Sequence, residues 1–199
     1  MKVVLADYGA GNLRSVTSAL GRAGADAVVT VDPELVASAP LAVIAGVGHV
    51  ESAARGLAEA GLDDAIRDRA ERGAPTFGIC VGMQLLFEES DEGGRGLGLL
   101  EGPVRRLAAR RVPHMGWNTL RVVTPNGPLS GLDGADVYFA HSFAVEADPS
   151  VVAATAEHDG TVVAAVERGP VAGVQFHPER SAAAGARLLE NVLAWSRSV

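Results

Sequence analysis

The only cysteine of the chain lies between two glycines, in the stretch Gly78-Ile79-Cys80-Val81-Gly82. An apolar run typical of a buried strand precedes it, and a run with helical spacing follows it. A thiol at such a strand-to-helix turn fits the nucleophile elbow known for serine as G-x-S-x-G. The flanking glycines would allow backbone from other segments to approach closely. A position at a helix N-terminus would favour the thiolate form of Cys80, and the amide of Val81 would point to where an oxyanion develops. The alternative is a buried cysteine that only fills the core.

A thiolate nucleophile needs a general base, and only one of the five histidines has an obvious orienting partner. His177 ends an apolar, strand-like run and is followed by Pro178 and Glu179. Pro178 disfavours a helical His177, and in an extended segment residues i and i+2 project to the same side. The Glu179 carboxylate can therefore orient the imidazole of His177, as in a catalytic triad. A strand-end turn with a surface glutamate is the alternative.

The other histidines do not form a recognisable metal site. His49 and His158 are expected to be exposed, and no pair of histidines has the H-E-x-x-H spacing of a zinc protease. The chain has no second cysteine that could complete a metal-binding set. We therefore expect no metal and no other cofactor.

Composition narrows the class of protein. The 199 residues are 48% hydrophobic, as in ordinary globular proteins. Their net charge of −7 argues against binding to nucleic acids or anionic membranes, because both need basic patches. One cysteine cannot form an internal disulfide, which indicates a reducing compartment. The apolar start is too short for a signal peptide, and no run approaches the ~20 residues of a membrane span. We expect one cytoplasmic domain, residues 1–199, with no nucleic-acid or membrane partner.

The elements that must position these residues differ between the two halves. Strands are expected in the first half at 3–6, 27–31, 41–45 and 75–79, and helices at 13–20, 62–69 and 81–89. Closely spaced strands with Gly and Pro turns follow at 120–123, 137–139, 151–156, 161–166 and 171–176. A last helix has Ser181 as a candidate N-cap. The predicted fold is α/β: a parallel-core sheet flanked by helices, with antiparallel hairpins packed beside it.

The stretches Gly78–Gln84 and Phe176–Glu179 together resemble the class I (triad) glutamine amidotransferases. In that family Cys, His and Glu hydrolyse the amide of glutamine through a thioester and pass ammonia to a synthase. Three further stretches narrow the resemblance: DYGAGNLRSV at 7–16, PHMGWN at 113–118 and YFAHSF at 138–143. They are similar to the members of histidine biosynthesis, whose ammonia goes to a cyclase subunit that forms imidazole glycerol phosphate and AICAR.

The resemblance implies a role for each matching position. The implied triad is Cys80 as nucleophile, His177 as base and then acid, and Glu179 as orienter. The residues implied to form the oxyanion hole and to hold L-glutamine are Val47, Val81, Gln84, Ser142 and Phe143. The chain departs from the family at one point, because Ala45-Gly46-Val47-Gly48 stands where Pro-Gly-Val-Gly is usual. Alanine does not fix φ, so the resting conformation of this oxyanion loop is left open.

Residues 113–118 combine a histidine, a methionine and a tryptophan, which make a good interface anchor if they are exposed. From the residue types alone, the interpretation of Met115 and Trp117 as core residues is favoured. The resemblance assigns the stretch to the contact with the cyclase barrel in a heterodimer. The implied interface residues are His114, Met115, Trp117, Asn118 and Arg180.

Three other functions stay open at this point. Gly9–Arg14 follows a strand and opens a helix, and Asp32 ends the next strand, as in a dinucleotide-binding fingerprint whose third glycine is here Arg14. Cofactor absorbance in the purified protein would support that interpretation. A cysteine hydrolase on the same scaffold would need no partner. An inactivated scaffold subunit would not need Cys, His and Glu to be intact.

Overall fold

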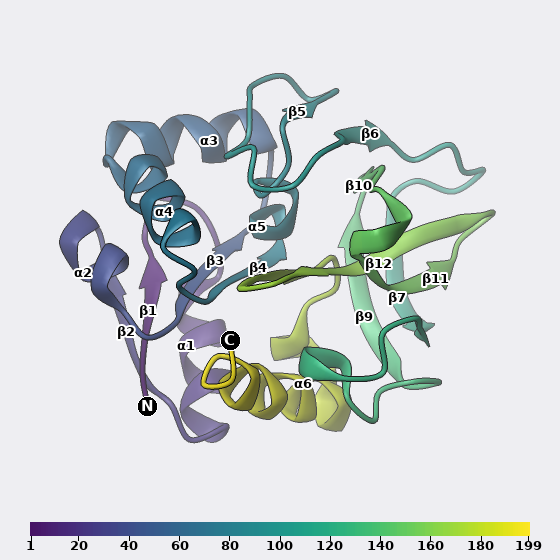
Figure 1. The fold of residues 1–199 in the computed structure, drawn as a ribbon. Coiled ribbons are helices and arrows are strands. Elements are labelled where there is room, and N and C mark those ends of the chain that lie inside the picture. The colour runs from purple at the N-terminus through teal and green to yellow at the C-terminus, as the bar shows by residue number, and fades with distance from the viewer.

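The structure is a computed structural model that describes all 199 residues. Its largest sheet contains β1 (Lys2–Ala6), β2 (Asp26–Thr30), β3 (Ala42–Gly46), β4 (Thr76–Cys80), β8 (Arg121–Val122), β11 (Val152–Glu157), β12 (Thr161–Arg168) and β13 (Val171–Val174). The strand order is β2-β1-β3-β4-β13-β12-β11-β8 (Figure 1). The sheet thus joins strands from both ends of the chain.

The first five strands of that order run parallel, and the remaining ones are antiparallel to their neighbours. The predicted parallel core with an antiparallel section is confirmed. The section does not pack beside the parallel sheet, however. It continues the same sheet, because β13 pairs in parallel with β4 on one side and antiparallel with β12 on the other. Every residue of β3, β4 and β13 is buried, as expected for strands covered on both faces.

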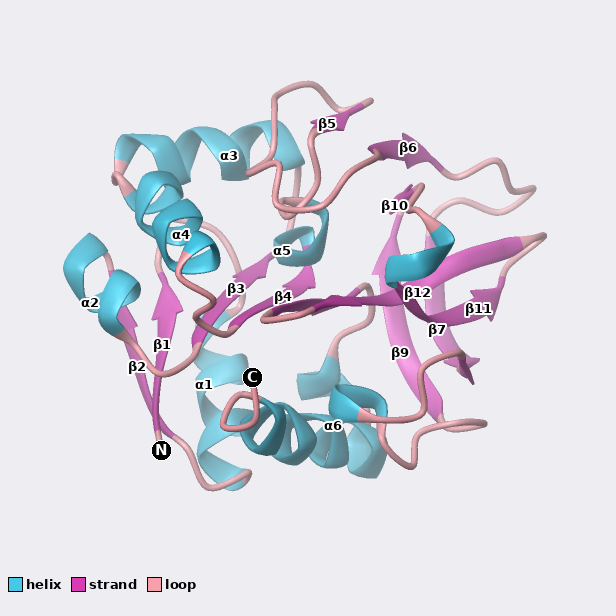
Figure 2. Ribbon diagram, viewed as in Figure 1, coloured by secondary structure: helices cyan, strands magenta, loops and turns pink.

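Helices cover both faces of the sheet (Figures 1 and 2). They are α1 (Leu13–Arg22), α2 (Pro33–Ser38), α3 (Val50–Glu59), α4 (Leu62–Glu71), α5 (Val81–Gln84) and α6 (Ala182–Trp195). In Figure 1, α1 and α6 lie below the sheet, and α2, α3 and α4 lie above it. Short 3-10 turns occur at Gly127–Leu129, Pro149–Val151 and Pro178–Arg180. No helix combines the length and the apolar character needed to cross a membrane.

Two small sheets stand beside the large one. One has the strand order β10 (Phe143–Val145), β6 (Pro103–Arg106), β5 (Glu89–Ser90), and the other pairs β7 (His114–Thr119) with β9 (Asp136–His141). The sequence did not predict β7 as a strand. Its antiparallel register places His114 opposite His141 and Trp117 opposite Tyr138.

The helix expected at 81–89 ends already at Gln84. The carbonyls of Leu85, Leu86 and Phe87 accept hydrogen bonds from amides of residues 97–100, so they are not available to a continuing helix. Gly96 permits this approach, since a Cβ there would lie 2.1 Å from the Phe87 carbonyl oxygen. The residues after Gln84 therefore pair with residues 97–100 instead of continuing the helix.

Ser181 precedes α6 as predicted, but its hydroxyl makes no cap hydrogen bond to the helix. It donates to the carbonyl of His177 at 2.6 Å and accepts from the amide of Tyr138 at 3.0 Å. The side chain thus fastens the His177 segment to β9.

Candidate active site

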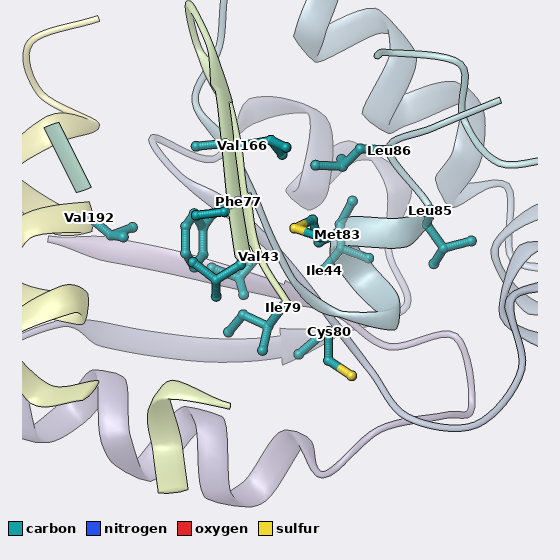
Figure 3. Packing of buried hydrophobic residues seen from close by; sticks show 14 of the residues in the cluster. Val43, Ile44, Phe77, Ile79, Cys80, Met83, Leu85, Leu86, Val166 and Val192 are labelled. Atoms are coloured by element: carbon teal, nitrogen blue, oxygen red, sulfur yellow. The ribbon is translucent and has the colours of Figure 1, made fainter. Parts of the chain in front are cut away.

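Cys80 is the last residue of β4 and directly precedes α5. Its φ of 55° and ψ of −112° are rare for a residue with a side chain and typical of strained functional turns. A Cβ at Gly82 would lie 1.7 Å from the carbonyl oxygen of Ile44, and one at Gly78 would lie 2.6 Å from that of Gly82. The turn therefore requires both glycines. Figure 3 shows the Cys80 sulfur pointing away from the apolar side chains that pack around β4.

His177 and Glu179 form a buried pair, which excludes a surface glutamate. Nδ1 of His177 lies 2.9 Å from Oε1 of Glu179, and the two side chains are 8% and 3% exposed. Because Nδ1 is hydrogen-bonded to Glu179, Nε2 is the ring nitrogen available for the hydrogen bond with Cys80. Burial alone would lower the pKa of His177, but hydrogen bonds with Cys80 and Glu179, together with their negative charges, raise it to about 10. The environment thus favours the imidazolium form of His177.

A cavity of about 480 Å³ lies over Cys80 and His177. It is also lined by the residues that were implied to contact glutamine or its oxyanion, namely Val47, Val81, Gln84, Ser142 and Phe143. Met115 and Arg180, implied to contact a partner, reach the same cavity. Residues predicted from five separate stretches of sequence are thus brought to one place.

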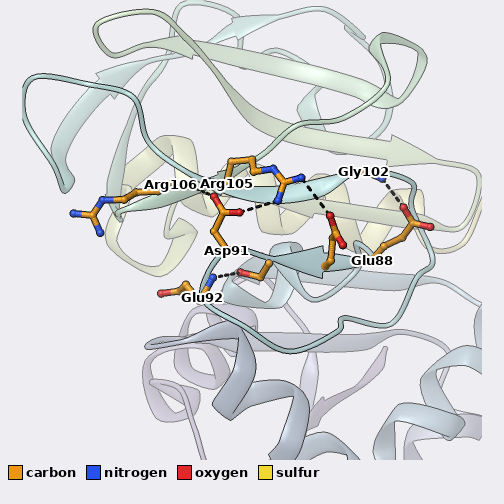
Figure 4. A network of polar contacts seen from close by, with 8 residues as sticks. Glu88, Asp91, Glu92, Gly102, Arg105 and Arg106 are labelled. Atoms are coloured by element: carbon orange, nitrogen blue, oxygen red, sulfur yellow. Dashed lines mark hydrogen bonds and ion pairs between the residues drawn. The ribbon is translucent and has the colours of Figure 1, made fainter.

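Three polar residues from outside the stretches singled out in the sequence also line this cavity: His49, Glu92 and Arg106. Nδ1 of His49 lies 2.8 Å from Oε1 of Glu92, whose Oε2 accepts from the Val50 amide. Arg106 extends away from the network in which Arg105 pairs with Glu89 and Asp91 (Figure 4). The cavity wall therefore carries charges of both signs. No sequence spacing signals them, because the three residues come from unrelated segments of the chain.

The oxyanion loop is held at its first residue. Tyr8 donates a hydrogen bond to the carbonyl of Ala45 at 3.0 Å, and a Cβ at Gly46 would lie 2.1 Å from the Tyr8 hydroxyl. Burial, then the nearby charges of Cys80 and Asp7, raise the pKa of Tyr8 well above its usual value, which keeps the phenol a donor. Val47 beyond this anchor is 45% exposed. Tyr8 thus supplies a constraint at the position where the family usually has proline.

The N-terminal stretch packs on this loop. A Cβ at Gly11 would lie 2.7 Å from the Ala45 carbonyl oxygen, so the glycine serves close packing. Asp32, the candidate ribose ligand of a dinucleotide site, accepts hydrogen bonds from the amides of Glu34 and Leu35 and caps α2. These contacts argue against the dinucleotide interpretation.

Strand β7 presents its two faces differently. Met115 and Trp117 are 64% and 56% exposed, so neither is a core residue. His114 was also implied to contact a partner, but its side chain points inward and is only 3% exposed. Alternation along a strand explains the difference, because successive side chains face opposite sides. The intermediate burial of Asn118 reflects hydrogen bonds to the ring of His114 and the carbonyl of Glu157.

His158 is half-buried instead of exposed, because its ring stacks on that of His114 with 4.1 Å between centroids. His114 stacks on Phe139 as well, at 4.4 Å. Its Nδ1 lies 2.9 Å from Nε2 of His141, whose Nδ1 lies 2.8 Å from the Phe143 carbonyl. Burial, then the neighbouring ring charges, lower the pKa of His114 to about 4, and burial lowers that of His141 to about 3. No group of three or more His, Cys, Asp or Glu side chains is placed to hold a metal ion.

The family model "Glutamine amidotransferase class-I" matches residues 4–194. The chain is 45% identical to the imidazole glycerol phosphate synthase subunit HisH of Moorella thermoacetica, over 95% of this chain and 92% of that protein. It is 46% identical to the subunit of the same name from Caulobacter vibrioides, over 97% and 98% of the two chains.

Solved structures agree at the level of the fold. A crystal structure of a glutamine amidotransferase superposes with a TM-score of 0.80, at 25% identity over 98% of both chains. The structure of PurLQS from Thermotoga maritima gives a TM-score of 0.76, at 22% identity and the same coverage. The glycine-flanked thiol, the buried His–Glu pair beside it and these matches over almost the whole length lead to one conclusion: the chain belongs to the class-I glutamine amidotransferases, together with the HisH subunits.

Proposed function

We propose that this chain is a glutaminase that hydrolyses L-glutamine to L-glutamate and ammonia. The observation that carries the proposal is that Cys80 and His177 meet on one cavity while the buried Glu179 holds His177 from behind. The charges of Glu92 and Arg106 on the wall of that cavity suit the ammonium and carboxylate groups of a free amino acid. The family to which the chain belongs supports the same reaction.

In the first half-reaction the Cys80 thiolate attacks the side-chain amide carbon of glutamine. The amides of Val47 and Val81 stabilise the oxyanion that forms, because both residues line the cavity beside the thiol. His177 then donates its proton to the leaving nitrogen, so ammonia departs and a thioester remains on Cys80. Glu179 keeps the imidazole oriented and stabilises its positive charge.

In the second half-reaction water attacks the thioester while His177 accepts its proton. Collapse of the intermediate releases L-glutamate and restores the thiolate and the imidazolium. Gln84 and the backbone at Ser142 and Phe143 hold the substrate through both steps, which their places on the cavity wall support. The reaction consumes one glutamine and one water and needs no cofactor.

We further propose that the ammonia goes to a cyclase subunit of imidazole glycerol phosphate synthase. The relatives are named as subunits of that synthase, which implies a partner. The exposed Met115 and Trp117 and the cavity-lining Arg180, whose guanidinium lies 4.1 Å from the Tyr138 ring centroid, supply a contact surface beside the active site. Formation of imidazole glycerol phosphate itself belongs to the partner, a barrel in this proposal. A single domain over residues 1–199 and a cytoplasmic location stay predictions.

A covalent trap tests the glutaminase proposal. A glutamine analogue with a diazoketone in place of the amide should alkylate the protein once, and mass spectrometry should place the adduct on Cys80. The same analogue should abolish release of glutamate and ammonia. Loss of activity with the adduct on any other residue contradicts the proposal, and so does a thiol that reacts equally with an analogue lacking the α-amino-acid group.

A further inference from the structure

Gln175 is completely buried, follows β13 and has no role in the mechanism described above. The parallel register of β4 and β13 ends with Ile79 opposite Val174, so Gln175 and Cys80 come next, side by side. Its backbone amide donates to the Ala164 carbonyl at 2.9 Å, which fixes its position. The side chain therefore meets the elbow from the neighbouring strand.

Donor and acceptor chemistry determines which way the Gln175 carboxamide points. The Phe143 carbonyl can only accept, so the group of Gln84 that lies 2.9 Å from it is the nitrogen, Nε2. The same Nε2 lies 2.9 Å from Gln175, which must present its oxygen there. The nitrogen of Gln175 is consequently turned to the other side, 3.7 Å from the sulfur of Cys80.

The Phe143 carbonyl that begins this argument is itself held by the buried histidines. It accepts from Nδ1 of His141, so Nε2 of neutral His141 accepts from Nδ1 of His114. Nε2 of neutral His114 in turn accepts from the amide nitrogen of Asn118. The tautomers of both histidines are thus determined, and the hydrogen bonds connect β7 to the nucleophile through the Phe143 carbonyl, which accepts from His141 on one side and from Gln84 on the other.

We propose that Gln175 is a further catalytic residue, whose side-chain nitrogen donates a hydrogen bond to the Cys80 thiolate. The inference rests on the proposed glutaminase function. A buried amide N–H cannot hydrogen-bond to water, so leaving it without an acceptor is costly. A hydrogen bond to a charged acceptor is also stronger than one to a neutral acceptor. The sulfur thus has two donors, His177 from one side and Gln175 from the other.

Alkylation of the single thiol measures this effect without glutamine. The rate of reaction with iodoacetamide, followed by mass spectrometry against pH, gives the midpoint at which the Cys80 thiolate forms. In Gln175→Met the midpoint should rise by about one pH unit, because one charge-assisted hydrogen bond is lost. Gln175→Glu, which replaces the donor by an oxygen, should raise it further. A folded Gln175→Met protein with an unchanged midpoint overturns the inference.

Other ionisable groups around the sulfur are unchanged in these variants, so they do not produce the shift. They are Tyr8 and Asp7 from the N-terminal segment, His177 and Glu179 after β13, and His49, Glu92, Arg106, His141 and Arg180 on the cavity wall. Val174→Ala is the matched control, because it disturbs packing at the preceding buried residue of β13 without removing a donor. Its midpoint should equal that of the unchanged protein, and an equal shift in both variants would show a packing effect.

A second measurement needs no substitution at Gln175 and decides the matter if Gln175→Met does not fold. In the unchanged protein, the side-chain amide signals of Gln175 in nuclear magnetic resonance spectra should move with pH at the alkylation midpoint. Cys80→Ser should abolish that movement. Signals that do not respond to the thiol overturn the inference. Glutamine turnover is measured separately, after addition of the cyclase and its nucleotide substrate: absent turnover there with a shifted midpoint contradicts the proposed function alone.

Discussion

At the scale of single residues, the site depends on how the protein balances charge around one sulfur. Hydrogen bonds and opposite charge outweigh the effect of burial on the pKa of His177. His114 and His141 have no negatively charged partner, so burial lowers their pKa values. His177 is therefore protonated at neutral pH, whereas the nearby His114 and His141 are neutral. The difference decides which of them can serve as a general acid.

Substitutions in the triad should form a graded series. Cys80→Ser should abolish glutamine hydrolysis while circular dichroism stays unchanged, because a hydroxyl is a far poorer nucleophile than this thiol. His177→Ala should lower kcat by about a hundredfold to ten-thousandfold through loss of the acid and base. Glu179→Gln should be milder, since an amide still orients the ring but cannot stabilise its charge. Residual turnover in folded Cys80→Ser would remove Cys80 from the mechanism.

The buried neutral histidines should make the fold sensitive to acid. An unfolded histidine titrates near 6.5, whereas the folded pKa values are about 4 for His114 and about 3 for His141. Between pH 6.5 and 4 the unfolded chain binds more protons, so the free energy of unfolding falls as pH is lowered. Each histidine contributes at most about 1.4 kcal/mol per pH unit.

Urea unfolding at pH 7, 6 and 5 measures this slope. The glutamine in His141→Gln cannot titrate but can still donate to the Phe143 carbonyl. This variant should therefore lack the contribution of His141 to the dependence of the unfolding free energy on pH. Equal slopes for His141→Gln and the unchanged protein would show that His141 is protonated in the fold.

At the scale of elements, strand β7 joins the active site to the outer surface. Its inward residues belong to the histidine network, and its outward residues are exposed hydrophobics next to the cavity. The Trp117 ring packs edge-on against Tyr138, with 6.1 Å between centroids, and over half of its surface remains open. A strand with this division fits a contact surface better than a core element.

Trp117→Ala should therefore affect assembly more than folding. Binding to the cyclase, measured by calorimetry, should weaken by about 2 kcal/mol or more if Trp117 is a hot spot. The melting temperature of the isolated subunit should change little. Thr119→Ala, on the same outward face of β7, is a matched control that should not alter binding to this extent. A large loss of thermal stability with unchanged binding would contradict this assignment of Trp117.

Individual elements show what the sequence could predict. The runs that became β1, β3 and β4 are apolar apart from Lys2 and Thr76, so their burial in a parallel sheet followed from composition and spacing. The helix after Cys80 was overestimated, because apolar spacing does not show that residues 97–100 occupy its carbonyls. Gln175 escaped notice because its role depends on strand order, which places β13 beside β4. The pairing of His177 with Glu179 and the strained turn at Cys80 were predictable, because a His-Pro-Glu turn and a glycine-flanked thiol are local signals.

At the scale of the whole molecule, hydrolysis without an acceptor would waste glutamine, so the isolated subunit should be nearly silent. The oxyanion loop is the candidate switch. Gly46 and Gly48 on either side let the Val47 peptide adopt two orientations at small steric cost, and Gly48 already has a φ of 92°. Only one orientation directs an N–H to the oxyanion, and a missing donor lowers turnover by about a hundredfold to a thousandfold.

Addition of the cyclase and its nucleotide substrate should therefore raise glutamine turnover by about a hundredfold or more, if the partner binds the active orientation better. Coupled detection of glutamate measures this, with the cyclase alone and the nucleotide alone as controls. Ala45 in place of the usual proline should give a higher basal rate than Ala45→Pro, although Tyr8 anchors the same residue. Equal turnover in the free subunit and the liganded complex would rule out gating by the loop.

The position of β13 also has a consequence for how the protein is made. Gln175 and Cys80 are 95 positions apart in the sequence, yet their strands are neighbours in the middle of the sheet. As the chain leaves the ribosome, β4 keeps one edge unpaired until β13 emerges. The thiol therefore acquires its base and its second donor in the same step that closes the sheet. A growing chain therefore carries the thiol through almost half of its synthesis before Gln175 and His177 can reach it.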